Sequence, residues 1–114
     1  MALYTSAAVL DGTVTAYTPT NEVFGPGYSL GGNVVTVAAV GFDSATGTAF
    51  VTFNNVGWTS AAFTARAALI YNTTSGQNNA SVAVLDFGQN LTSTGTFTVI
   101  MPGNTATTAL IRSV

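Results

Sequence analysis

The spacing of turn-forming residues constrains the fold of this chain more than any other feature. Short runs rich in Thr, Val and aromatic residues are separated by Gly, Pro, Asn and Ser at intervals of about 8–12 residues. Leu, Glu and Lys, which favour helices, are scarce or missing. The pattern predicts an all-β protein, an antiparallel β-sandwich (jelly-roll-like) of about eight short strands with little or no helix.

Length and apolar content predict one folded domain over residues 1–114. The chain has 114 residues, of which 47% are hydrophobic and 11% are aromatic. This length is sufficient for one compact core and too short for two. The apolar content is high enough to offset the conformational entropy lost on folding, so we do not expect disorder.

Two hairpins are the clearest local predictions. Asn33 to Phe42 is expected to pair with Thr48 to Asn54 across the turn Asp43 to Gly47, in which glycine can adopt a left-handed conformation. Ala65 to Asn72 is expected to pair with Ser81 to Phe87 across a polar loop.

Four further segments are predicted to be strands, and one segment has an alternative. The strands are Leu3 to Thr5, Thr13 to Tyr17, an alternating run around Phe97 to Met101, and Thr107 to Arg112. The Ala-rich segment Thr59 to Leu69 could also form a helix, although its Thr, Phe and Ile content and its lack of capping residues favour a strand.

Charge is unusually rare. Only 5% of residues are charged, against about 25% in an ordinary soluble domain. A monomer of this size would expose roughly 5,800 Å², which leaves about one charge per 1,000 Å². This deficit predicts that much of the surface is covered in an assembly. Alternatively, the abundant Thr, Ser and Asn side chains hydrate the surface by hydrogen bonding to water, and charge is not needed. The six charged residues are Asp11, Glu22, Asp43, Arg66, Asp86 and Arg112.

Composition also excludes several partners. With no Lys, two Arg and a net charge of −2, no basic surface can neutralise phosphates, so we do not expect nucleic-acid binding. No apolar run reaches membrane-spanning length, and the start of the chain lacks the features of a signal peptide. The absence of Cys excludes disulfides and zinc thiolate sites.

Three motifs resemble parts of enzyme active sites, and none predicts an enzyme. Gly27 to Gly31 matches the G-x-S-x-G nucleophile motif, but the chain has no His to act as the base. Asp86 to Gly88 imitates a kinase tripeptide, yet there is no Lys, so we expect Asp86 at a strand end facing solvent or pairing with an Arg. Asp43 is expected to accept backbone hydrogen bonds in a turn rather than bind a metal. We therefore predict no catalytic residue, no cofactor and no metal site.

Aromatic residues and arginines are the candidates for subunit contacts. Both types are enriched at protein interfaces, although the same aromatic side chains could instead fill a core or form a sugar-binding platform. The two arginines could also be outward or acid-paired residues. The predicted interface residues are Tyr4, Phe24, Pro26, Tyr28, Trp58, Arg66 and Arg112.

The chain as a whole resembles a family of small virion proteins of tailed bacteriophages. The resemblance spans nearly all of the sequence. Members often carry a short leader before the segment that begins at Ala2, so we expect a first strand or anchoring arm to be absent here. The similar segments are Ala2–Ala8, Thr20–Val23, Gly25–Tyr28, Gly31–Gly32, Thr64–Asn72, Val82–Gly88, Gly95–Val99 and Ala109–Arg112.

The resemblance implies a structural protein of the virion. The first expectation is a capsid decoration, or cement, protein on the outer surface of the capsid, made in the host cytoplasm without a signal peptide. Its partners would be the major capsid protein and copies of itself, in a cyclic homo-oligomer such as a trimer. The alternative is a tail or fibre module that binds a host glycan or surface protein through loops 72–80 and 103–105. An enzyme such as a polysaccharide lyase is a distant third hypothesis.

Overall fold

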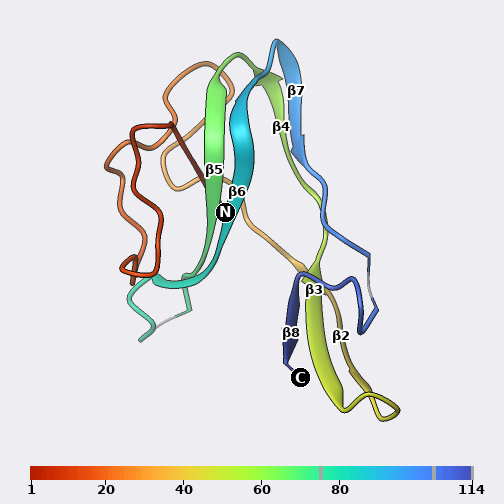
Figure 1. Ribbon diagram of the computed structural model, residues 1–114. Coiled ribbons are helices and arrows are strands. Elements are labelled where there is room, and N and C mark those ends of the chain that lie inside the picture. The colour runs from red at the N-terminus through yellow and green to blue at the C-terminus, as the bar shows by residue number, and fades with distance from the viewer. Residues whose placement is uncertain (75, 104, 114) are drawn as a thin grey trace. The chain divides into compact units, whose positions relative to one another are not determined.

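The computed structural model describes residues 1–74, 76–103 and 105–113, and within these ranges it contains eight strands and no helix (Figure 1). The all-β prediction with about eight strands is confirmed, whereas the sandwich arrangement stays a prediction. The strands are β1 (Ala2–Tyr4), β2 (Val37–Asp43), β3 (Thr48–Phe53), β4 (Val56–Ala61), β5 (Thr64–Asn72), β6 (Ala80–Thr92), β7 (Gly95–Val99) and β8 (Ile111–Ser113).

The strands form three small sheets, with orders β1-β5-β6, β2-β3-β8 and β4-β7. The chain divides into two compact units. The first unit comprises Met1–Asn33 and Gly57–Phe97, and the second comprises Val34–Val56 and Thr98–Val114. The expectation of a single domain over residues 1–114 stays a prediction.

In the first unit, β5 is the central strand of its sheet and carries much of the core. It pairs antiparallel with β1 on one side and with β6 on the other. Ala67, Ala68, Leu69 and Ile70 are all buried, so neither face of the strand is open to solvent. The helix alternative for Thr59 to Leu69 is therefore wrong, because this segment builds β4 and β5 with β-branched and aromatic residues among the alanines.

Strand β6 is longer than predicted and contains a wide bulge. Its register jumps between two pairs, Ala65 with Leu91 and Ala67 with Asp86, so residues 87–90 lie opposite Arg66 alone. Gly88 has a φ of 79°, a conformation that favours glycine. The prediction that the strand ends near Phe87 is wrong, since the chain bulges at this glycine and then resumes pairing up to Thr92.

An aromatic cluster completes the core of the first unit. Trp58 and Phe97 meet edge to face with ring centroids 6.1 Å apart, and Phe63 lies 5.3 Å from Phe97. Tyr28 stacks on Trp58 at 6.2 Å, and Phe87 borders Phe97 at 6.0 Å. Such arrangements add to the stabilisation that burial of the rings supplies.

A glycine holds the end of the 21–33 loop against the start of the chain. Gly32 has a φ of 74°, and a Cβ atom there would collide with the carbonyl oxygen of Met1. The neighbouring Asn33 N–H donates to that same Met1 oxygen at 3.1 Å. The N-terminal amine of Met1 donates to the Asn33 carbonyl at 2.6 Å, so the two backbone segments are joined in both directions.

The second unit is built on the β2–β3 hairpin, with β8 on the other side of β3 (Figure 1). The predicted pairing of the two hairpin strands is confirmed, although the first strand begins at Val37 and not at Asn33. The carboxylate of Asp43 accepts from the Ala45 N–H at 2.9 Å, its carbonyl accepts from the Gly47 N–H at 2.8 Å, and Gly47 has a φ of 69°. The expected role of Asp43 as a turn residue is therefore also confirmed.

Three strand predictions require correction. Thr13 to Tyr17 forms only an isolated bridge between Ala16 and Ala80, because the segment meets β6 at that strand's first residue alone. The C-terminal strand is shorter than Thr107 to Arg112, since residues 105–108 form a hydrogen-bonded turn and β8 begins at Ile111. The single strand favoured for Thr59 to Leu69 is in fact divided, because β4 begins earlier, at Val56, and ends at Ala61 before β5 begins at Thr64.

Candidate interaction surface

Two of the predicted interface residues lie in the core. Tyr4 and Trp58 are 0% and 2% exposed, respectively. The Tyr4 hydroxyl donates to the Thr18 carbonyl at 2.8 Å, while the indole of Trp58 packs in the aromatic cluster. Both side chains therefore stabilise the first unit from within and leave the surface to other residues.

Three more predicted residues lie in the turn between Phe24 and Tyr28. Phe24 is 95% exposed, and Pro26 is exposed as well. The turn itself is fixed, because the Pro26 carbonyl accepts from the Ala62 N–H at 3.0 Å and a Cβ on Gly27 would meet the backbone of Ser60. Tyr28 is half-buried and points its hydroxyl inward.

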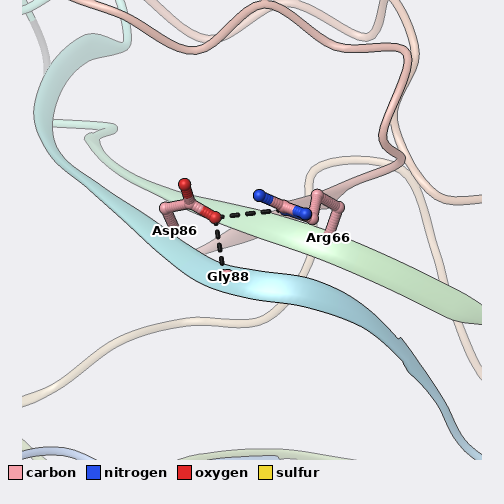
Figure 2. Close-up of polar contacts among 3 residues, drawn as sticks. All are labelled: Arg66, Asp86 and Gly88. Atoms are coloured by element: carbon pink, nitrogen blue, oxygen red, sulfur yellow. Dashed lines mark hydrogen bonds and ion pairs between the residues drawn. The ribbon is translucent and has the colours of Figure 1, made fainter.

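The two arginines make separate local contacts. Figure 2 shows Asp86 between two donors, the Arg66 Nε at 3.2 Å and the Gly88 N–H at 2.8 Å. These two hydrogen bonds, that of Gly88 first, lower the pKa of Asp86 below its ordinary value. The prediction that Asp86 pairs with an Arg is confirmed. Arg112 is exposed and donates to the Thr107 carbonyl at 2.6 Å.

A buried carboxyl group organises the N-terminal part of the first unit. Glu22 is 7% exposed and accepts three hydrogen bonds, from the hydroxyls of Tyr17 at 3.0 Å and Tyr28 at 2.8 Å and from the Gly31 N–H at 2.8 Å. The Tyr28 hydroxyl also accepts from the Leu3 N–H at 2.9 Å. This Glu22 network ties the 17–31 segment to β1, and it was not predicted from the sequence.

The tyrosines in and around this network are shifted toward the protonated form. Burial raises the pKa of Tyr4 and of Tyr17 to about 12, and it also raises the pKa of Tyr28 and of Tyr71. Proximity to Glu22 acts in the same direction on all four phenols. All four hydroxyls donate hydrogen bonds in the first unit, to Glu22 or to the carbonyls of Thr18 and Gly31.

The second unit exposes one apolar sheet face. Residues paired across antiparallel strands share a face, so Val40 and Val51 continue across the sheet to Ile111 of β8. The pair of Phe42 with Ala49 lies on the same face, two residues along each strand. Val37, Val40 and Phe42 are 55%, 75% and 67% exposed. We call this surface the apolar face; its residues are Val37, Val40, Phe42, Ala49, Val51, Phe53 and Ile111.

The opposite face of the same sheet is largely covered. Thr48 and Thr52 are buried, and the Thr52 hydroxyl donates to the Pro102 carbonyl at 3.4 Å. The ring of Phe50 lies over Gly41, where a Cβ atom would collide with it. The contrast leaves the apolar face as the uncovered side of this sheet.

The ranges that the structure describes hold neither a metal-binding cluster nor a membrane-spanning helix. No group of three or more acidic, His or Cys side chains there could hold a metal ion. Within the same ranges, no helix is long and apolar enough to cross a membrane. Of the loops considered for host recognition, Ser75 and Asn104 lie outside the described residues.

No protein-family model, curated protein or solved structure matches this chain.

Proposed function

We propose that the protein is a virion structural component of a tailed bacteriophage, a capsid decoration (cement) protein that binds over the joints between capsid subunits. The apolar face is the observation that supports this proposal best. Its three large exposed side chains, Val37, Val40 and Phe42, lie together on one sheet face, and contiguous exposed apolar patches often mark interaction sites. The sequence resemblance described above supports the same role.

The rarity of charge fits this function. A surface that faces solvent permanently usually carries both signs of charge, whereas the interior of an interface is depleted of charge. The described surface has one ion pair, between Arg66 and Asp86, and both of its residues belong to the first unit. We place the contact with the shell on the apolar face of the second unit, where many copies would each add a small stabilising interface.

The direct test is the number and position of copies in purified virions. A copy number near that of the major capsid protein, with density for this chain on the outside of the shell, is the expected result. A handful of copies located at the tail would overturn the decoration proposal and favour the tail or fibre alternative.

A charge on the apolar face tests the contact itself. Ala49 is exposed on this face but lies on the middle strand β3, so Ala49→Asp leaves the sheet edges unchanged. We expect it to weaken binding to undecorated capsids by more than about tenfold, because the carboxylate would be desolvated without a partner. Ala7→Asp, at an exposed alanine of the first unit, is the control and should bind normally. Equal binding by both variants would contradict the assignment.

A further inference from the structure

The three aspartates of the chain share one local geometry. In each of them a carboxylate oxygen accepts a hydrogen bond from the backbone N–H two residues further on, at 2.8 Å for Asp11, 2.9 Å for Asp43 and 2.8 Å for Asp86. This arrangement is an Asx turn, which folds the carboxyl group back over the peptide that joins the aspartate to the next residue. The nitrogen of that peptide is therefore close to the carboxyl carbon.

The residue that follows the aspartate distinguishes the three turns. A side chain on this residue hinders the approach of its nitrogen to the carboxyl carbon, whereas glycine leaves the approach open. A Cβ atom on Gly12 would meet nothing within 4 Å, and no described residue accepts a hydrogen bond from the Gly12 N–H. The nitrogen after Asp11 is therefore neither crowded nor held by another group. The following residues are Gly12, Ser44 and Phe87, respectively.

We propose that Asp11 is a site of spontaneous isomerisation to isoaspartate in the folded protein. The Gly12 nitrogen attacks Cγ of the protonated carboxyl group, the new N–Cγ bond closes a succinimide ring, and the amide hydrogen leaves with the carboxyl hydroxyl as water. Water then adds to the main-chain carbonyl carbon of Asp11 and breaks its bond to the Gly12 nitrogen, so the backbone continues through Cγ. The conversion requires only water, and the inference does not depend on the proposed function.

Thr13 orients the reacting carboxyl group with a second contact. Its hydroxyl donates at 2.6 Å to the same Asp11 oxygen that accepts from its N–H. Two donors on one oxygen hold the group in one orientation and withdraw electron density from Cγ, which favours attack at that carbon. These bonds, that of the hydroxyl first, also lower the pKa of Asp11. The conversion should therefore be measured in a mildly acidic buffer, which populates the protonated carboxyl.

The position of Asp11 gives the modification a structural consequence. Leu10 and Val14, on either side of the turn, pack against a buried cluster formed by β1 and β5. Isomerisation inserts a methylene into the backbone between these two contacts and takes the carboxylate out of the Asx turn. The segment that covers this part of the core then fits less well, so ageing should lower the denaturant concentration at which the protein unfolds.

Ageing of the purified protein tests the site, because Asp43 and Asp86 are internal controls. After ageing and denaturation, an endoproteinase that cleaves before aspartate but not before isoaspartate reports on all three positions in one digest. Cleavage before Asp11 should decline with time, while cleavage at the other two stays constant. An equal decline at all three positions, or none at Asp11, would overturn the proposal. A decline confined to protein aged in denaturant would also overturn it, because the folded turn would then protect Asp11.

Two glycine variants complete the test. Gly12→Ala places a methyl group in open space at a residue whose φ is not positive, so the fold should be preserved. It should slow the loss of cleavage before Asp11 by more than about tenfold. Gly95→Ala is the matched control, because its Cβ is equally unobstructed and no aspartate precedes it. It should age at the wild-type rate, and equal rates in the two variants would contradict the inference.

Denaturation midpoints before and after ageing test the structural consequence. The midpoint of the wild-type protein should fall on ageing, whereas that of Gly12→Ala should stay constant. Equal shifts in the two proteins would show that isomerisation at Asp11 does not loosen the segment around it.

Discussion

Glu22 has a larger structural role than any other charged residue in the described chain. It is the one charged side chain that is buried among the described residues. Its two carboxyl oxygens accept hydrogen bonds from two tyrosine hydroxyls and one backbone N–H. Each such bond contributes roughly 1 kcal/mol, and leaving one donor buried without its acceptor costs more. The sequence could not reveal this role, because Glu22 resembles any solvent-facing acid until the loop folds back onto β1.

Alkaline pH should unfold the protein because of its tyrosines. In the unfolded chain the phenols ionise near their ordinary pKa of 10, whereas burial holds the pKa of Tyr4 and Tyr17 at about 12 in the folded protein. The folded state therefore retains protons that the unfolded state releases, and stability present below pH 10 is lost as the pH rises toward 12. Denaturant titrations with tyrosine absorbance should show this loss. Ionisation of all phenols at pH 10 without unfolding would contradict it.

At the scale of elements, the sequence predicted the segments whose partners are close along the chain. The β2–β3 and β5–β6 pairs were correct, because turn residues such as Asp43 and Gly47 mark where the chain reverses. Thr13 to Tyr17 has the same β-forming composition but forms only a bridge at Ala16, since a strand needs a partner and not only propensity.

The candidate surface was harder to predict than the strands. An apolar residue in a strand has the same sequence pattern whether a neighbouring segment covers it or not. Phe42 and Trp58 illustrate this, because the first is 67% exposed and the second is buried. The charge deficit predicted a covered surface without locating it, whereas the register of β2, β3 and β8 shows which apolar residues share an exposed face.

Replacement of a glycine should test the junction between β1 and the 21–33 loop. Gly32→Ala would force an alanine to a φ of 74° and push its Cβ into the Met1 carbonyl. We expect a loss of about 2 kcal/mol or more in the free energy of unfolding, measured by chemical denaturation. Gly95→Ala is the control, because nothing lies within 4 Å of a Cβ there and its φ is not positive. Equal stability of the two variants would show that the junction does not constrain the fold.

At the scale of the whole molecule, the low charge should govern association. The sequence pI is about 4.2, and only six charged side chains oppose contact between copies. As the pH approaches the pI, the net charge falls to zero and repulsion between molecules disappears. Sedimentation across a range from about pH 8 to about pH 4 should show growing assemblies or precipitation. A stable monomer at low concentration across this pH range would contradict the prediction that the weakly charged surface associates with other protein.

The short, charged strand β8 also determines how far such association extends. A β2 edge that met the opposite edge of the next molecule would leave a fresh edge each time, and the result would be a growing fibre. Because β8 offers three residues and the exposed Arg112, the far side of the sheet is a poor template for further growth. Growth of a fibre through this side of the sheet is therefore disfavoured, whatever the other edge meets.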